Sequence, residues 1–248
     1  MTTVLVIAGS DSSGGAGLTR DVRTLTQLGV QARCVVTAVT AQSDARVYAV
    51  HVVPPELVRA QLAAACATGP VDAIKIGMLA TRATVLAVCA GLPAKALPVV
   101  LDPVLASSSG GELLDAEGRE ALRSTLLPRV TLLTPNIPEA AALLGSDCAQ
   151  SEAELLRQAR ALLALGPEAV LLKGGHGSGP EASDLLLRRD AAPQWLRAPR
   201  IATVRRGTGC ELAAAIATGL AGGLDVATAC ERAKQQLTQS LGQAPPRV

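Results

Sequence analysis

Short apolar runs alternate with amphipathic segments along the chain. The apolar runs are dominated by Val, Leu and Ile and carry few charges, which is typical of strands buried on both faces of a sheet. We expect strands of this kind at residues 3–9, 32–40, 71–77, 98–102, 130–134 and 168–174. The segments between them have the helical spacing of apolar residues. They predict helices at residues 16–29, 54–67, 81–92, 116–127 and 151–166.

This alternation predicts an α/β fold, with a mainly parallel central sheet and helices on both faces. Residues 183–189 and 193–199 have no long helix between them, so we expect them to add antiparallel strands at one edge. A last helix is expected at 224–241, and Ser151 begins a capping-box pattern. Because no segment has the composition of a linker, residues 1–248 are expected to form one domain.

Composition excludes several kinds of partner. The chain has 248 residues, of which 49% are hydrophobic, and a formal net charge of +2 without any basic block. We therefore expect no nucleic-acid partner. No apolar run approaches the ~20 residues that span a bilayer, and the first apolar run lacks the charged start of a signal peptide. The sequence thus predicts a cytoplasmic protein with no membrane partner.

Cysteines and histidines give no metal pattern. The six cysteines are scattered without a Cys-x-x-Cys pair, and the two histidines are far apart in the sequence. Such spacing is typical of reduced thiols in an intracellular protein. It argues against a zinc site and against a histidine-based catalytic triad.

Polar residues follow the predicted strands, where ligands bind in parallel α/β sheets. Glycines and serines fill residues 9–17. The later strand ends carry Gln42, Lys75, Met78, Asp102, Asn136, Glu139 and Lys173. Each has an ordinary explanation: an amide or acid can cap a helix, and the other charges can be solvated loop residues. Taken together, the carboxylates suit hydrated Mg²⁺ and the lysine suits phosphate, as phosphoryl transfer requires.

Gly207-Thr208-Gly209-Cys210 precedes an alanine-rich helical segment. Glycines at that position expose the first backbone amides of the helix, whose partial positive charge suits an anion. We expect the helix end to lower the pKa of the Cys210 thiol from its usual ~8.5, which would prepare it to accept a proton from an attacking alcohol. The simpler alternative is that Cys210 is a small apolar residue filling space.

Taken in order, these motifs resemble a known family of kinases. The matching stretches are IAGSDSSGGAG, TAVTAQS, KIGML, LDPV, TPNIPEAAALL, LLKGGH and GTGC. The chain resembles the hydroxymethylpyrimidine/phosphomethylpyrimidine kinases of thiamine biosynthesis, which belong to the ribokinase-like superfamily. The resemblance implies a three-layer α/β fold and ATP with Mg²⁺. It also implies a homodimer and phosphorylation of the hydroxymethyl group of the pyrimidine, followed by phosphorylation of the monophosphate.

The resemblance also implies a role for each matching residue. The pyrimidine would be contacted by Gly9, Ala16, Asp21, Gln42, Met78 and Val104. Magnesium would be held by Asp102 and Glu139. The nucleotide and its phosphates would be contacted by Asn136, Glu139, Lys173 and Thr208. Arg206 is expected at the nucleotide as well, although it is not a matching residue and stands where the family has a histidine. Gly207, Gly209 and Cys210 would form an anion hole, with Cys210 at the position of the catalytic base and Asp102 beside it.

The sequence departs from the family pattern around this anion hole. Arg206 replaces a histidine and Glu211 replaces a hydroxyl residue. Ser43 replaces an asparagine and is followed by Asp44. Arg205 and Arg206 could supply a cationic contact to the nucleotide phosphates. Glu211 is unfavourable beside an anion unless it points away or pairs with an arginine. Two alternatives stay open: a pyridoxal or pyridoxine kinase, and a catalytically degenerate paralogue that binds a thiamine precursor.

Overall fold

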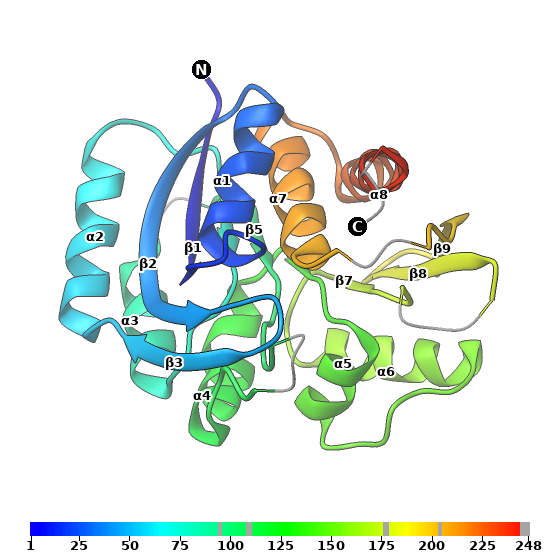
Figure 1. Ribbon diagram of the computed structural model, residues 1–248. Helices are drawn as coiled ribbons and strands as arrows, with labels where there is room; N and C mark the ends of the chain where they lie inside the picture. The colour runs from blue at the N-terminus through cyan, green and yellow to red at the C-terminus, as the bar shows by residue number, and fades with distance from the viewer. Residues whose placement is uncertain (94–95, 108–110, 176–178, 203–204, 244–248) are drawn as a thin grey trace.

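The computed structural model describes residues 1–93, 96–107, 111–175, 179–202 and 205–243. Within these ranges nine strands form one sheet in the order β3-β2-β1-β4-β5-β6-β7-β8-β9 (Figure 1). The strands are β1 (Thr3–Asp11), β2 (Gln31–Gln42), β3 (Val47–Val52), β4 (Ala73–Ile76), β5 (Val99–Leu101), β6 (Leu132–Leu133), β7 (Ala169–Leu172), β8 (Glu181–Arg188) and β9 (Gln194–Pro199). Strands β2, β1, β4, β5, β6 and β7 pair in parallel, whereas β3, β8 and β9 pair antiparallel with their neighbours.

Helices cover both faces of the sheet. They are α1 (Gly17–Gln27), α2 (Pro55–Ala67), α3 (Arg82–Gly91), α4 (Ala116–Ala121), α5 (Ile137–Leu144), α6 (Glu152–Ala164), α7 (Thr208–Ala221) and α8 (Val226–Gly242). Helices α1, α7 and α8 share one hydrophobic core with the sheet, and α2 to α6 share the other. The predicted three-layer architecture is confirmed.

Strand β1 shows how the sequence produces these two cores. Its side chains alternate between the faces, so that Leu5 and Ile7 join the core under α2 to α6. Val4 and Val6 join the core under α1 and α7. All four are fully buried. A run of consecutive apolar residues is therefore what a central parallel strand requires.

Two local features differ from the prediction. The helix expected at 116–127 is α4 followed by a π turn (Leu122–Leu126) and a 3₁₀ turn (Leu127–Arg129). Pro128 lies in that last turn, and its lack of a backbone N–H removes a helical hydrogen bond. Strand β3 was not predicted at all. It lies at the edge of the sheet with its side chains exposed or half-buried, so it carries no burial pattern.

Parallel strands bring their carboxyl ends to one edge of the sheet. Beyond β6 and β7, the Lys173 amide donates a hydrogen bond to the Pro135 carbonyl over 2.8 Å, and Asn136 and Lys173 form an isolated parallel bridge. The N-terminus of α7 reaches the same edge (Figure 1). In the described part of the chain, no helix has the length and apolar composition needed to cross a membrane.

Candidate active site

A cavity of about 900 Å³ opens at the carboxyl ends of the parallel strands. Almost all of the predicted site residues line it, although they come from segments spread over the whole chain. Those at its wall are Gly9, Ala16, Gln42, Met78, Asp102, Val104, Asn136, Glu139, Lys173, Arg206, Gly207, Thr208, Gly209 and Cys210. Asp21 is the one predicted site residue that does not line the cavity.

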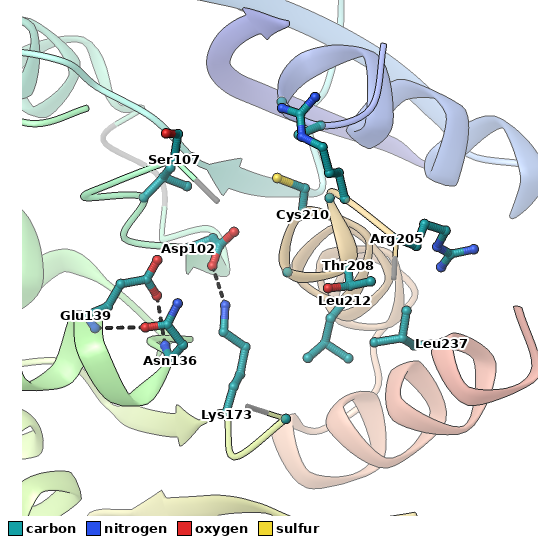
Figure 2. Close-up of a pocket in the computed structure, with 18 of the residues that line it drawn as sticks. Asp102, Ser107, Asn136, Glu139, Lys173, Arg205, Thr208, Cys210, Leu212 and Leu237 are labelled. Carbon is teal, nitrogen blue, oxygen red and sulfur yellow. Dashed lines mark hydrogen bonds and ion pairs between the residues drawn. The ribbon is translucent and has the colours of Figure 1, made fainter. Parts of the chain in front are cut away.

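Asp102 and Lys173 form an ion pair at the centre of this wall. Lys173 Nζ lies 2.7 Å from Asp102 Oδ1, and Figure 2 shows the lysine reaching up from the end of β7 to the carboxylate. Both side chains are largely buried. Burial lowers the pKa of Lys173, but the charges of Asp102 and Glu139 outweigh it and raise the pKa above its ordinary value. The lysine is therefore a fixed cation in the cavity.

Asn136 and Glu139 form a complete capping box at the start of α5. The Asn136 side chain accepts from the Glu139 amide, and the Glu139 carboxylate accepts from the Asn136 amide, each over 2.8 Å (Figure 2). The ordinary explanation of this pair as a helix cap is correct, and the same residues also line the cavity. Burial raises the pKa of the Glu139 carboxyl to about 7, against the opposing charge of Lys173.

The N-terminus of α7 approaches the other walls through its glycines. Gly207 is the N-cap, and its φ of 73° is a conformation that favours glycine. A Cβ on Gly207 would collide with the carbonyl oxygen of Gly15. A Cβ on Gly209 would lie 3.1 Å from Lys173 Nζ and 3.5 Å from Asp102 Oδ2. No side chain caps this helix, and Gly207, Thr208, Gly209 and Cys210 all line the cavity. Uncapped amides at a helix start carry the partial positive charge that suits an anion.

Cys210 lies in the first turn of α7 and lines the cavity, but its protonation state differs from our expectation. Burial raises the pKa of the thiol to about 11, the charge of Lys75 opposes this, and Asp21 and Asp102 add to it. The prediction of a lowered pKa was therefore wrong. Loss of water around the thiol outweighs the partial positive charge of the helix end.

Asp21 lies behind the wall of the cavity, so its predicted contact with the substrate needs correction. Its side chain is fully buried in α1, and Asp21 Oδ2 lies 2.7 Å from Lys75 Nζ, which is also fully buried. Burial raises the pKa of the Asp21 carboxyl to about 6. Lys75, unlike Asp21, lines the cavity. The role of Asp21 that the geometry supports is to hold this lysine.

An apolar wall with one amide closes the opposite side of the cavity. Met78 is buried with Ala38, Ala80 and Leu113, and Val104 packs against them. A Cβ on Gly9 would lie 2.8 Å from Met78 Sδ, so only glycine allows this close packing. The side chain of Gln42 lines the same wall and accepts a hydrogen bond from Thr40 Oγ1 over 3.2 Å. Apolar side chains with one polar group among them are typical of a small-molecule pocket.

The two unusual arginines before α7 reach in opposite directions. Arg205 Nη2 lies 2.7 Å from Glu211 Oε2, and its Nη1 donates to Ser240 Oγ on α8 over 2.8 Å. Arg206 Nη2 lies 3.0 Å from Asp11 Oδ2, and its Nη1 lies 3.3 Å from Asp44 Oδ1. Glu211 is thus neutralised by an arginine. The geometry does not support the predicted nucleotide contact of Arg206, because carboxylates of the β1–α1 turn and the β2–β3 hairpin occupy its guanidinium.

Comparison with known proteins identifies the family of this chain. The family model for phosphomethylpyrimidine kinase matches residues 11–247. The chain belongs to this family. It is 44% identical over 246 residues to a hydroxymethylpyrimidine/phosphomethylpyrimidine kinase of Rhizobium meliloti, covering 98% of this chain and 92% of that protein. It is 41% identical to the thiamine biosynthesis bifunctional protein ThiED of Geobacter sulfurreducens, over 98% of this chain and 50% of that protein.

Solved structures of related kinases have the same fold. The phosphomethylpyrimidine kinase of Clostridium difficile superposes with a TM-score of 0.84 at 34% identity, over 97% of this chain and all of that one. An ADP complex of Bacillus subtilis pyridoxal kinase superposes with a TM-score of 0.90 at 32% identity, over 100% and 94%. The predicted family, fold and kinase class are confirmed.

Sequence reasoning missed three charged residues at this kinase site. Lys234 on α8 lies 2.7 Å from Asp184 on β8, and Asp184 Oδ1 also accepts from the Gly174 amide over 2.9 Å. This pair therefore holds Gly174, the residue that directly follows Lys173. Asp11 organises the turn into α1. An isolated acid inside an apolar strand, as at Asp184, was a usable signal, whereas Lys234 on an amphipathic helix gave none.

The donors present fit magnesium bound together with a nucleotide. Among the described residues, no group of three or more His, Cys, Asp and Glu side chains is arranged to hold a metal ion. Mg²⁺ does not need such a group, because kinases bind it through one or two carboxylates, phosphate oxygens and water. Asp102 offers a buried carboxylate and Glu139 a half-buried one at the same wall, and these are oxygen ligands of the kind that Mg²⁺ prefers.

Proposed function

We propose that this chain transfers the γ-phosphoryl group of ATP to 4-amino-5-hydroxymethyl-2-methylpyrimidine, to its monophosphate, or to both. One observation carries the proposal: Gly209, at the anion-binding end of α7, lies directly against the Lys173–Asp102 ion pair. Phosphoryl transfer needs donors aimed at the phosphate oxygens and a fixed cation beside them. The relatives named as kinases of this pyrimidine support the choice of substrate.

The α7 amides and Lys173 would share the charge of the transferred group. In the loose transition state of phosphoryl transfer, negative charge spreads over the equatorial oxygens, and preorganised donors stabilise it. Amides at residues 208–210 supply such donors from one side, and Lys173 supplies a cation from the other. Magnesium, held by Asp102 and Glu139 together with the phosphates, would offset the remaining charge.

Cys210 would act as the base in this proposal. Because burial raises its pKa to about 11, the thiol of the ligand-free protein is protonated at neutral pH. It can accept the proton of the hydroxymethyl group only after substrate binding has lowered this pKa. Cys210→Ala tests the role: an essential base predicts a large fall in kcat with nearly unchanged ATP affinity, whereas near-full activity excludes it.

The apolar wall and Gln42 would bind the pyrimidine. Gln42 can both donate and accept, which suits a ring nitrogen next to an amino group. Met78 and Val104 offer aliphatic surface in a chain with one Trp, one Tyr and no Phe. The substrate would therefore be recognised by polar edges and aliphatic packing without aromatic stacking.

Pyridoxal is the second candidate substrate. The Bacillus subtilis pyridoxal kinase, which superposes with a TM-score of 0.90, supports it. Pyridoxal also carries a hydroxymethyl arm on a flat heterocycle. A degenerate paralogue has less support, because the unusual residues at the anion hole neutralise one another: Arg205 pairs with Glu211, and Arg206 with Asp44.

One experiment separates these candidates. The protein is incubated with Mg-ATP and hydroxymethylpyrimidine, its monophosphate or pyridoxal, and the phosphorylated product is measured. The proposal predicts turnover of one or both pyrimidines at a higher kcat/KM than pyridoxal. Preferred turnover of pyridoxal would establish the second candidate. Saturable binding of a pyrimidine without any turnover would leave only the degenerate paralogue.

We also propose that the chain acts as a single domain, as a homodimer, in the cytoplasm. Beyond the family resemblance, the β2–β3 edge supports a dimer, since Val39, Tyr48 and Val50 are exposed there. An unprotected edge strand with apolar side chains is a common site of association. Light scattering after gel filtration measures the mass directly, and a monomer at micromolar concentration would overturn the dimer.

A further inference from the structure

Arg206 joins three segments that are far apart in the sequence. It precedes the N-cap of α7, and its side chain is 10% exposed. Its Nη1 donates to Ser13 Oγ over 2.8 Å and to the Ser43 carbonyl over 3.2 Å. Together with the ion pairs to Asp11 and Asp44, these contacts connect the loop before α7 to the β1–α1 turn and to the β2–β3 hairpin.

Asp11 is the centre of the first connection. Its Oδ1 accepts from the Ser13 amide over 2.9 Å, and its Oδ2 accepts from the Ala16 amide over 3.0 Å. Asp11 therefore shapes the turn that carries Ala16 to the cavity wall. Arg206 binds the same carboxylate, and a Cβ on Gly15 would lie 3.2 Å from Arg206 Nη1. The arginine is thus packed against the turn as well as paired with it.

The second connection reaches the residues around Gln42. The Gln42 amide donates to Ser12 Oγ over 2.8 Å, and Ser12 Oγ donates back to the Gln42 carbonyl over 2.9 Å. Asp44 lies two residues further along the same hairpin. Arg206 therefore holds the hairpin to the loop before α7, at the place where Gln42 enters the cavity wall.

We propose that Arg206 is a positioning residue that fixes the substrate-side wall of the cavity, Ala16 and Gln42 included, relative to the anion-binding end of α7. This sets where the hydroxyl of the bound heterocycle lies with respect to the phosphoryl group. The identity of that heterocycle rests on the proposed function, but the connection does not. The guanidinium of Arg206 presents two separate nitrogens to Asp11 and to Asp44 with Ser13, whereas lysine has a single ammonium nitrogen and is a poor substitute.

The charges around Arg206 make a nucleotide-binding role unfavourable. Two carboxylates face one guanidinium, so the cluster of Arg206, Asp11 and Asp44 presents no positive charge to a phosphate. Arg205 lies in the neighbouring position but makes its contacts on α7 and α8. In Figure 2 its side chain lies on the far side of α7 from Asp102. The connection to the substrate-side wall therefore belongs to Arg206 and not to a general basic patch.

Hydrogen–deuterium exchange tests the connection without any substrate. In Arg206→Ala we expect faster amide exchange in peptides covering residues 11–17 and 42–47, and unchanged exchange in α2 and α6. Asp44→Asn, which removes the ion pair of Arg206 with the hairpin but not the one with Asp11, should raise amide exchange in 42–47 more than in 11–17. Arg197→Ala, at an exposed ion pair on β9, is the matched control and should change neither. Unchanged exchange in both peptides of Arg206→Ala would overturn the proposal.

Kinetics then distinguish positioning from simple destabilisation. We expect Arg206→Ala to lower kcat/KM for the heterocycle about 10- to 100-fold through misplacement of its hydroxyl, with KM for ATP nearly unchanged. Arg206→Lys should recover little of this loss. A rise in KM for ATP alone would overturn the proposal in favour of a nucleotide contact. If the unmodified protein phosphorylates neither heterocycle, the proposed function fails, while the exchange data still decide the connection.

Discussion

Gly209 lies against Lys173 so closely that a single added methyl group would reach the lysine, 3.1 Å from its Nζ. This contact places the N-terminus of α7 next to the ion pair of Lys173 and Asp102 at the end of the sheet. The same position allows activity and stability to be tested separately. Gly209 is in a helix, where alanine has a higher helix propensity than glycine, so an alanine there should not destabilise the helix itself.

We predict that Gly209→Ala lowers kcat on the order of 10- to 100-fold while the protein stays folded. The methyl group displaces the flexible end of Lys173 by a few tenths of an ångström and covers the anion site. Steady-state kinetics and thermal unfolding measure the two effects. Gly242→Ala, at a glycine of α8 with open space around it, is the control and should retain full activity. Full activity of Gly209→Ala would exclude the proposed anion hole.

Alkylation should report the raised pKa of Cys210. With a pKa of about 11, the thiolate fraction increases about tenfold for each pH unit between 7 and 9.5. The rate of iodoacetamide labelling at Cys210, followed by peptide mass spectrometry, should therefore rise over this whole range without a plateau. A plateau below pH 8 would mean that the helix end does lower the pKa. Added Mg-ATP and pyrimidine should protect the thiol.

The buried pair of Lys75 and Asp21 should behave as one unit in stability. Lys75→Met leaves the Asp21 carboxylate buried without its partner, which typically costs ~3–5 kcal/mol in the free energy of unfolding. Lys75→Met with Asp21→Leu removes both charges, and we expect it to recover most of that loss. Urea denaturation measures all three proteins. The exposed pair Arg197–Glu152 serves as a comparison, with an expected coupling of ~0–1 kcal/mol. A double variant no more stable than Lys75→Met would contradict this interpretation.

Glu211 balances two arginines, Arg205 at 2.7 Å and Arg20 at 3.8 Å. Glu211→Gln removes that negative charge beside the anion site. We expect it to cost ~2–4 kcal/mol of stability, because two largely buried guanidinium groups lose their counter-charge, and to tighten the binding of a non-hydrolysable ATP analogue. Calorimetric titration measures the affinity, and the gain should shrink at high salt. Glu152→Gln is the exposed control. Unchanged nucleotide affinity at low salt would show that Glu211 does not influence the anion site.

Much of the fold could be predicted because apolar runs and their spacing report burial. The central strands were correct, and β3 was missed because an exposed edge strand has no buried face to leave a pattern. The residues that line the cavity could be predicted from topology, because the carboxyl ends of parallel strands lie together at one edge of the sheet. Asn136 shows that one residue can have both a local and a site role, because it caps α5 and also lines the cavity.

What failed in the sequence prediction depended on three-dimensional surroundings. The pKa of Cys210 follows from burial, which its position at a helix start does not reveal. The directions of Arg205 and Arg206 follow from which carboxylates lie within reach, and those lie up to 195 residues away. Asp21 was expected to contact the substrate, whereas its carboxylate is fully buried in an ion pair with Lys75. A motif names the residues of a site but not which of them contact the ligand.

The ion pair between Arg206 and Asp11 joins residues that are 195 positions apart in a chain of 248. On a ribosome, Asp11 emerges early and its turn can form, but Arg206 is synthesised only after all nine described strands of the sheet, the last of which ends at Pro199. Contacts of such high sequence separation form late and slow the folding of a domain. We therefore expect binding competence to arrive only with the last fifth of the polypeptide, because a nascent or truncated chain lacking α7 has all nine described strands but an incomplete cavity wall.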